Sequence, residues 1–525
     1  MRHRIAWIIG LLTALAGVPV PAAVPVQAGN AAPKSLQVLL QDISVPSGVR
    51  FRIAPEIAQD RVQAQPEGTA WPDIIRHLLR GYNYAGTWSA SGKLTEVNVT
   101  GRNGDGRVPA AAPALDELFA YRPGRSVPAQ YRIYAPGSVY PIEVPARRLR
   151  NMKKGERLYA NLPDGRYALV HDNAWKHGNG DLTWVGYLDG PQGRYRALLT
   201  LGDDGALAGQ ILTPGGLYKL ESDEGGGQWL VDMDDSGLQN GGFEGDESPV
   251  SSGIGATGPL PQSAVGAGAK VKVRDGGGST QPADTTATQD GKSLIDVLLL
   301  YTAGMGNTGV ATRLNQLMAL ANQALADSQV NALFRLAAAQ KVGYADRTPN
   351  AAALDRLTYA GKGFRNIPRL RAQYGADVVA LVRPFKPQSQ GGNCGIAWVD
   401  GGGDTPLTAD QAFAVVGYGA AGGYYCSDYA LAHEIGHVMG ATHDRAHATT
   451  PGKFPYSYGY GVPGRFGDIM SYYDPEVGVY ANPDLAVCAG SPCGVPIDQP
   501  GAADVALTFN QTAPTVAAFS RSTSP

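Results

Sequence analysis

The sequence has little net charge, few cysteines and, beyond its first residues, no apolar run long enough to span a bilayer. Its 44 Lys and Arg residues nearly balance its 46 Asp and Glu residues, which gives a formal net charge of -2. Binding to nucleic acid or to an anionic membrane through the overall field requires a marked positive excess. We therefore expect no nucleic-acid partner and no stable membrane insertion, and the oligomeric state stays open.

The composition argues against a disordered chain and against a helical bundle. Hydrophobic residues make up 43% of the 525 residues, which is enough to bury several cores. At about 150 residues per domain, this length corresponds to roughly three domains. The 69 Gly and 37 Pro residues indicate many turns and favour strands and loops over long helices.

The N-terminus has the pattern of a signal peptide, which we place at residues 1–28. Two arginines precede a short apolar run at residues 5–18, and Val26-Gln27-Ala28 offers a small-residue cleavage site. The alternative, a membrane anchor, needs about 20 apolar residues, and a glycine and a proline interrupt this run. We therefore expect a secreted, extracellular protein, with a periplasmic stage if the source is bacterial.

Export changes the interpretation of the cysteines, because thiols outside the cytosol usually pair. Four cysteines allow three disulfide connectivities. We favour Cys488 with Cys493, close neighbours in a Pro/Gly turn, which leaves Cys394 to pair with Cys426. Zinc binding by these thiols is disfavoured because the chain contains no Cys-x-x-Cys pair.

Hydrophobic patterns predict an α+β multidomain protein. Residues 35–102 alternate amphipathic helical stretches with strand-like runs, and this small α+β module resembles the short N-terminal domain of secretins and TonB-dependent receptors. Residues 118–238 contain extended segments separated by Gly/Asp/Pro turns, which predicts a β-rich domain. The expected strands lie at residues 131–134, 167–171, 182–187, 195–201 and 228–231.

Residues 239–291 are rich in small and polar residues, which predicts a flexible linker because such a segment buries too little surface to offset its ordering entropy. After it, residues 292–523 are expected to form an α/β domain. The pattern predicts strands at 294–301, 376–382, 394–399 and 413–418, and helices at 310–328, 428–439 and 502–519.

Four of the eight histidines fall between positions 433 and 447. The segment from His433 to Asp444 reads HExxHxxGxxHD. Residues four apart lie on one face of a helix, so His433 and His437 can both reach a single zinc. Glu434 lies one residue away from that face, close enough to contact a zinc-bound water without being a ligand.

The glycine of this motif explains how a third ligand joins the first two. Gly440 can adopt the left-handed conformation that ends a helix, and the turn then brings His443 to the metal. Three imidazoles and one water make an open catalytic zinc site, whereas structural sites use four protein ligands and usually several thiolates. The pattern therefore predicts one catalytic Zn²⁺ held by His433, His437 and His443. A structural Ca²⁺ remains an open alternative that no residue pattern supports.

The motif, together with the later Ile469-Met470-Ser471-Tyr472, resembles the metzincin zinc endopeptidases with their zinc helix and Met-turn. Asp444 and the paired cysteines resemble the reprolysin (adamalysin)-like branch, and the bacterial secreted peptidyl-Asp metallopeptidases are a closer candidate. The resemblance implies a split α/β catalytic domain over residues 292–523, with Met470 packed beneath the imidazoles.

One residue departs from the reprolysin pattern. Tyr472 stands where reprolysins commonly have Pro, whereas astacins and serralysins carry a Tyr that can reach the metal. A metal or transition-state role and a pocket-wall role both stay open for Tyr472.

Asp444 is expected to make a framework contact and His447 to be a loop residue. If the peptidyl-Asp resemblance holds, an acidic side chain of the substrate should meet a cation, for which the candidates are Arg445, Lys453 and Arg465.

The motif predicts peptide-bond hydrolysis of protein or peptide substrates by zinc-activated water, with Glu434 as general base. The substrate is expected to lie antiparallel to the edge strand at residues 394–399. Two alternatives stay open. One is a zinc-containing binding or adhesion protein with vestigial catalysis, which the intact Glu434 disfavours. The other is a metallohydrolase that acts on a non-peptide substrate.

The sequence also predicts how a precursor could be kept silent. The first cysteine is Cys394, inside the catalytic region, so a propeptide cysteine cannot bind the zinc. If residues 118–238 act as a prodomain, they must cover the cleft sterically or supply an oxygen or imidazole ligand. Proteolysis within residues 239–291 would then release them.

Overall fold

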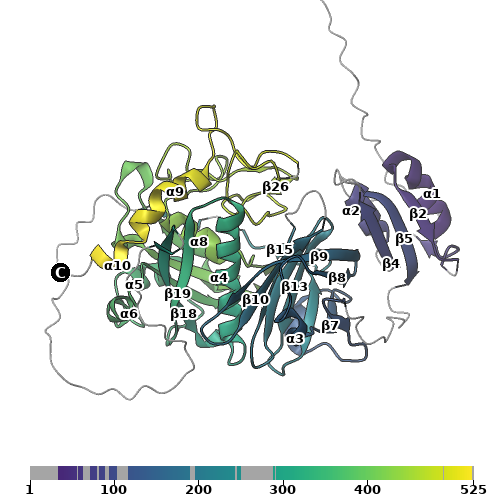
Figure 1. The fold of residues 1–525 in the computed structure, drawn as a ribbon, viewed down its shortest axis with the longest axis horizontal. Helices are drawn as coiled ribbons and strands as arrows, with labels where there is room; N and C mark the ends of the chain where they lie inside the picture. Colours follow the sequence, from purple (N-terminus) through teal and green to yellow (C-terminus); the bar gives the residue numbers. More distant parts are fainter. Residues whose placement is uncertain are drawn as a thin grey trace, which may run out of the picture.

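The structure is a computed structural model of the chain, shown as a ribbon in Figure 1. The described residues are 34–55, 57–62, 71–79, 82–88, 94–102, 116–189, 195–242, 245–249, 288–289, 291–488 and 490–522. The expected signal peptide, residues 1–28, and most of the expected linker lie outside the described residues. The mixed α/β architecture with a β-rich region, predicted from the sequence, is confirmed.

Among the described residues, no helix combines the length and the apolar character needed to cross a bilayer.

The N-terminal module packs helices against a small sheet. Helix α1 (Leu36–Ser47) begins at Ser35, whose hydroxyl accepts a hydrogen bond from the Val38 amide, and it ends at Gly48 in the left-handed conformation. The sheet has the order β2-β5-β4. The remaining elements are β1 (Lys34–Ser35), β2 (Arg50–Ile53), β3 (Arg61–Val62), α2 (Trp71–Leu78), β4 (Tyr82–Trp88) and β5 (Leu94–Arg102).

The second region is an antiparallel sheet of nine strands in the order β6-β7-β14-β13-β12-β11-β10-β9-β8. Consecutive strands from β8 to β14 pair as neighbours because short polar turns join them. The strands are β6 (Ala120–Tyr121), β7 (Val139–Glu143), β8 (Arg157–Leu162), β9 (Gly165–Lys176), β10 (Leu182–Leu188), β11 (Arg196–Leu201), β12 (Leu207–Thr213), β13 (Gly216–Ser222) and β14 (Gln228–Asp232).

The prediction of a strand at residues 131–134 is wrong. Residues 131–134 fall at the end of the 3-10 helix η1 (Ala129–Ile133), which follows Pro128. The buried Tyr131 ring packs 5.4 Å from the Trp229 ring, so aromatic packing rather than sheet pairing places this segment. A short helix, α3 (Ala146–Leu149), follows β7.

The third region is built on a mostly parallel sheet in the order β16-β21-β22-β20-β18-β17, with β19 paired to the other side of β18. Strand β21 is antiparallel to β22, whereas β18, β19, β20 and β22 run parallel. The strands are β16 (Glu247–Pro249), β17 (Thr288–Gln289), β18 (Lys292–Thr302), β19 (Ala332–Val342), β20 (Val378–Pro384), β21 (Gly395–Val399) and β22 (Phe413–Tyr418). Strand β19 was not expected from the sequence.

Helices cover this sheet and carry the C-terminal part of the chain. They are α4 (Val310–Asp327), α5 (Asn350–Thr358), α6 (Ile367–Tyr374), α7 (Pro387–Gln390), α8 (Ala430–Val438), α9 (Val505–Val516) and α10 (Phe519–Ser522). Both favoured disulfides are present, Cys394–Cys426 and Cys488–Cys493. The first of them ties the start of β21 to the loop that leads into α8.

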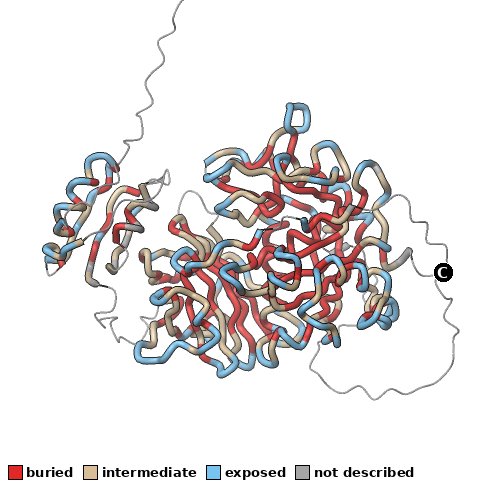
Figure 2. The backbone as a smooth tube through the Cα atoms, turned by 180° about the vertical axis from the view of Figure 1, so that it is seen from behind, coloured by how far each residue is buried: buried red, intermediate tan, exposed pale blue. Residues whose placement is uncertain are grey.

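The β-rich sheet packs directly on α4, so the second and third regions share buried surface. Val185 and Leu198 of the sheet belong to the same hydrophobic core as α4 and α8. Arg196 forms a bidentate ion pair with Asp327 at the end of α4, and Lys219 lies 2.8 Å from Asp428. Figure 2 shows buried backbone through both sheets, with exposed backbone at the loops around them.

Part of the expected linker is ordered. Strand β15 (Gln239–Asn240) pairs in parallel with β24 (Tyr424–Tyr425), and β16 pairs in parallel with β21. The expectation of a flexible segment across 239–291 is therefore wrong for residues 239–242 and 245–249. Composition alone could not show that strands from another part of the chain would form hydrogen bonds with the backbone N–H and C=O groups of this polar segment.

Candidate metal centre

Helix α8 places two of the predicted ligands side by side. All nine of its residues are buried, and the rings of His433 and His437 lie 4.8 Å apart between centroids. A helix buried all round is expected at the centre of a domain rather than at its surface. The two imidazoles are therefore presented from a rigid element.

The turn after α8 brings in the third imidazole. Gly440 has a φ of 92°, the left-handed conformation expected for this position. A Cβ atom there would lie 2.8 Å from the Cβ of Lys453, so space as well as backbone conformation favours glycine. Beyond the turn, the Nε2 atoms of His433, His437 and His443 lie 3.1 to 3.2 Å from one another.

The other nitrogen of each ring contacts an oxygen. The Nδ1 atom of His433 lies 2.6 Å from the Ile469 carbonyl oxygen, and that of His437 lies 3.0 Å from the Ala441 carbonyl oxygen. His443 Nδ1 lies 3.0 Å from a carboxylate oxygen of Glu247. Such contacts fix the ring orientation and leave the Nε2 lone pairs free to converge on a cation.

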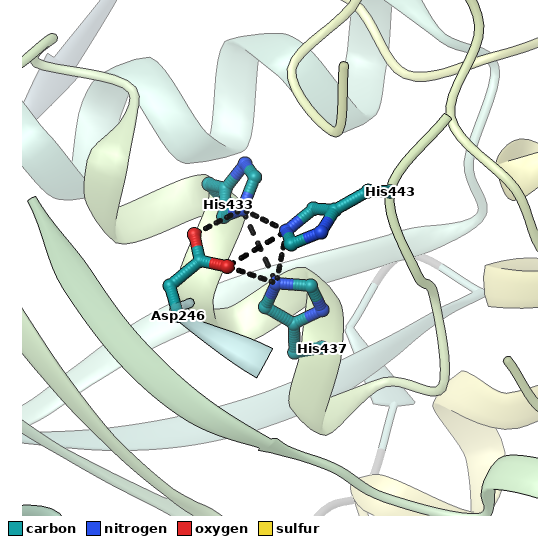
Figure 3. Close-up of side chains that lie close together, drawn as sticks. All are labelled: Asp246, His433, His437 and His443. Carbon is teal, nitrogen blue, oxygen red and sulfur yellow. Dashed lines mark hydrogen bonds and ion pairs between the residues drawn. The ribbon is translucent and has the colours of Figure 1, made fainter. Parts of the chain in front are cut away.

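A fourth donor comes from a residue that the sequence did not suggest. Asp246, directly before β16, is fully buried and places its carboxylate among the three Nε2 atoms (Figure 3). Its oxygens lie 3.1 Å from His433 Nε2, 2.9 Å from His443 Nε2 and 4.0 Å from His437 Nε2. In the sequence, Asp246 is one acidic residue in a polar stretch far from the motif, so no local signal marks it.

The donor set fits a zinc ion. The four groups offer one ligand atom each, and these atoms all lie within 4.8 Å of one another. Donors arranged as a tetrahedron around Zn²⁺ at about 2.0–2.1 Å would be about 3.3 to 3.4 Å apart, close to the observed spacing of the imidazole nitrogens. Three imidazoles and one carboxylate are ordinary zinc ligands, and together they complete a four-coordinate site.

Glu434 lies beside this cluster without being part of it. Its side chain is fully buried, and no described residue donates a hydrogen bond to either carboxylate oxygen. Gly395 of β21 makes room for it, because a Cβ atom on that residue would lie 2.0 Å from Glu434 Oε1. Packing against β21, rather than hydrogen bonding, therefore positions the carboxylate.

Tyr472 reaches the same centre from the segment after Met470. Its hydroxyl donates to Asp246 Oδ1 over 3.0 Å and lies 3.2 Å from His443 Nε2. Met470 is fully buried against α8, since a Cβ atom on Gly436 would lie 2.6 Å from its Sδ. The two residues thus contact the metal centre and the helix that carries two of its imidazoles.

Asp444 connects the third ligand to the Tyr472 segment. Its carboxylate accepts hydrogen bonds from the Ser471 hydroxyl and the Tyr472 amide, over 3.0 and 3.1 Å. His447 Nδ1 lies 2.8 Å from the same carboxylate. Asp444 therefore makes the framework contact that the sequence suggested, and His447 contacts Asp444 in the loop after His443.

Charge and burial shift several pKa values at the site. Burial raises the pKa of the Glu434 carboxyl well above its usual range, and the Asp246 charge adds to the effect. Burial and the charges of the other two imidazoles lower the pKa of His437 to about 3. Burial alone would lower the pKa of His443. The nearby Asp246 and Glu247 carboxylates have the larger effect and raise this pKa to about 9. His437 is thus neutral at pH 7, the form in which imidazole binds a metal.

Two family models match the chain. Residues 298–497 match the model described as metallo-peptidase family M12B, reprolysin-like. Residues 120–236 match the model described as the BamI lipocalin-like domain.

Several curated relatives are named peptidyl-Asp metalloendopeptidase. The relative from Pseudomonas aeruginosa is 31% identical over 45% of this chain and 41% of its own length. The one from Xanthomonas campestris pv. campestris is 32% identical over 38% of this chain and 45% of its length. The relative from Stenotrophomonas maltophilia strain R551-3 is 26% identical over 84% of this chain and 97% of its length. The chain therefore spans less than half of the first two relatives and nearly all of the third.

A solved structure described as metalloproteinase-II from Bacteroides fragilis is similar at a TM-score of 0.37 and 13% identity. The similarity covers 65% of this chain and 96% of that chain.

Proposed function

We propose that this chain, which carries a reprolysin-like M12B metallopeptidase domain at residues 298–497, is a zinc-dependent endopeptidase made as a latent precursor. The observation that carries the proposal is the convergence of three imidazole Nε2 atoms within 3.2 Å of one another, with the buried Glu434 carboxylate beside them. His433, His437 and His443 would hold the zinc.

A bound zinc supplies Lewis-acid polarisation of a peptide carbonyl and lowers the pKa of water. The chain's own residues perform the remaining steps. Glu434, held against Gly395, accepts the proton of the attacking water and passes it to the leaving amine. The Tyr472 hydroxyl, 3.2 Å from His443 Nε2, is placed to donate to the oxyanion that develops on the carbonyl. Once residues 245–249 leave, the edge of β21 that now pairs with β16 would hold the substrate backbone by strand addition.

The segment at residues 245–249 supports a latent state. With zinc bound, Asp246 would supply the fourth ligand in place of the water that an open catalytic zinc site keeps, and β16 pairs with the edge of β21 that a substrate would use. An aspartate oxygen thus takes the place that a cysteine fills in other precursors. Residues 118–238 would act as the prodomain that carries this segment.

Export of the protein is supported by the signal-peptide pattern of residues 1–28 and by two disulfides, which persist in oxidising compartments. The relatives' name, peptidyl-Asp metalloendopeptidase, supports a preference for acidic side chains in protein or peptide substrates.

The test uses the full chain with Asp246→Ala and Glu247→Ala, called the release variant. We expect this variant to hydrolyse casein, the activity to disappear with a zinc chelator and return with added Zn²⁺, and the unmodified chain to remain nearly inactive. The exposed Asp235→Ala is the matched control and should stay latent. A release variant that contains one zinc per chain but cleaves no peptide bond would contradict the proposed function.

A further inference from the structure

The carboxylate next to Asp246 lies in a pocket of its own. The Glu247 side chain is fully buried. Its oxygens accept hydrogen bonds from the Thr449 hydroxyl over 2.6 Å and from the Thr449 and Thr450 amides over 2.8 and 2.9 Å. The Thr442 hydroxyl and the His443 amide donate to the other oxygen.

All these donors belong to one short segment, residues 442–450, which lies inside the matched metallopeptidase domain. Glu247 lies outside that domain, in the segment that covers the metal centre. The pocket therefore stays with the metallopeptidase domain when residues 245–249 leave. The Thr442 hydroxyl can then donate to the Thr450 carbonyl oxygen, 2.8 Å away. The other donors need a new acceptor, because buried N–H and O–H groups are rarely left unpaired.

The groups that hold Glu247 are hydroxyls, backbone amides and the His443 ring, whose Nδ1 lies 3.0 Å from a Glu247 oxygen, rather than the Arg or Lys expected from the sequence. Lys453 donates to the Thr405 carbonyl oxygen over 2.8 Å. Arg445 donates to the Ala502 and Pro455 carbonyl oxygens, and Arg465 donates to the Ser491 hydroxyl. The three candidate cations thus make their described hydrogen bonds with other acceptors.

We infer that the pocket formed by Thr442, His443, Thr449 and Thr450 is a substrate subsite that binds a carboxylate side chain close to the scissile bond. This inference rests on the proposed function. Its position follows from His443, which supplies both an amide to the pocket and an Nε2 atom to the metal centre. The pocket is filled by a glutamate, so it accepts a longer acidic side chain than the aspartate in the relatives' name.

Backbone N–H groups also determine how the subsite discriminates. A glutamine has the shape of glutamate, but its NH2 group would face either the Thr449 and Thr450 amides or the His443 amide, none of which can accept a hydrogen bond. Buried polar groups left unpaired penalise the wrong side chain strongly. Because these contacts are buried, salt screens them little, and discrimination between Glu and Gln should change little between low and high salt.

The experiment uses zinc-loaded release variant and quenched fluorescent peptides that differ only by Glu, Asp or Gln at one position flanking the cleaved bond, each flanking position in turn. At one position we expect kcat/KM for Glu to exceed that for Gln by about 100-fold. Thr449→Val should lower the Glu value by about 10-fold and leave the Gln value unchanged, and Thr449→Ser should restore it. Thr515→Val, an exposed threonine of α9, is the matched control.

A binding measurement separates this inference from the proposed function. The release variant with Glu434→Gln is titrated with Gly-Asp-Glu-Ser-Pro and with Gly-Asp-Gln-Ser-Pro. At least 10-fold tighter binding of the glutamate peptide, lost in Thr449→Val, supports the subsite even if no peptide is hydrolysed. Equal binding of both peptides, or equal hydrolysis of the Glu and Gln substrates at every flanking position, overturns it.

Discussion

The three imidazoles of the centre differ from ordinary buried histidines in what surrounds their second nitrogen. Carbonyl oxygens of Ile469 and Ala441 lie within 2.6 to 3.0 Å of the Nδ1 atoms of His433 and His437. These contacts place the proton on Nδ1 and direct the Nε2 lone pair to the shared centre. An imidazole that only filled space would not need its Nε2 atom 3.1 to 3.2 Å from two others.

Glu434→Gln in the release variant should separate metal binding from catalysis. The imidazoles are untouched, so we expect zinc content near one per chain, while peptide hydrolysis falls by about 10²- to 10⁴-fold because the general base is lost. Zinc analysis and hydrolysis of one substrate check both parts. Glu143→Gln, at an exposed carboxylate, is the control. Unchanged turnover in Glu434→Gln would remove this residue from the reaction.

Tyr472→Phe tests the hydroxyl and keeps the ring, whose centroid lies 4.3 Å from that of His443. If the hydroxyl stabilises the oxyanion, kcat in the release variant should fall by about 10- to 1000-fold with little change in KM. Steady-state kinetics at saturating and limiting substrate give the two values. An unchanged kcat with a raised KM would instead make Tyr472 part of the pocket wall.

Among the secondary-structure elements, strand β21 has the largest part in the site. One of its edges pairs with β22, the other with β16, and Gly395 at its start packs against Glu434. The disulfide Cys394–Cys426 holds that start against the loop before α8. The strand thus positions Glu434, the proposed general base, pairs with the covering segment and provides the edge proposed for a substrate.

Gly395→Ala should reduce activity without removing the metal. The added Cβ would lie 2.0 Å from Glu434 Oε1, so the carboxylate must move, and a shift of about 1 Å costs on the order of 10²-fold in rate. We expect the overpacking to lower the free energy of unfolding by about 1–3 kcal/mol. Kinetics, zinc analysis and thermal unfolding measure these effects.

Gly343→Ala is the matched control for this change, because a Cβ atom there meets nothing within 4 Å. It should leave activity, zinc content and unfolding unchanged. Full activity in Gly395→Ala would show that Glu434 can act from another position.

At the scale of the whole molecule, the prodomain proposed here is held by more than the segment over the metal. The β-rich sheet contributes Val185 and Leu198 to the core around α4. The Lys219–Asp428 pair is nearly buried, with side chains 10% and 7% exposed. Residues 239–241 pair with β24 before the chain reaches Asp246. A cut beyond residue 249 therefore leaves the covering segment attached to a docked domain.

We expect a single cut between residues 250 and 287 to leave the protein latent. A protease site inserted there should give two fragments that elute together, because a tethered segment acts at an effective concentration in the mM range. Activity should appear only after a second cut between residues 239 and 245 or after the domain dissociates. Size-exclusion chromatography and peptide hydrolysis follow the two events.

Lys219→Met should make the singly cut protein dissociate and become active. Removal of the lysine leaves Asp428 buried without its partner, which costs about 3–5 kcal/mol. Lys154→Met, at a side chain 79% exposed, is the control and should change nothing. Full activity directly after the single cut in the unmodified protein would contradict the docked-inhibitor arrangement.

The local chemistry of this protein was determined by its sequence. The spacing of His433, Glu434, His437 and His443 puts two imidazoles on one helical face, and Gly440 has the backbone conformation that the turn requires. Four strands of the third region, β18, β20, β21 and β22, and both disulfides were also predictable, because buried strands need apolar runs and the close cysteine pair left one other pairing. These features depend on neighbours along the chain.

Only the tertiary structure decided what completes and covers the centre. Asp246 and Glu247 lie in a polar stretch whose composition predicts a linker, yet β16 is ordered because the edge of β21 pairs with its backbone. The carboxylate pocket consists of amides, hydroxyls and the His443 ring, which no pattern of Arg or Lys marks, so the sequence pointed to those cations instead. A contact between residues far apart in the chain depends on which surfaces the fold brings together, and neither hydrophobic periodicity nor motif spacing contains that information.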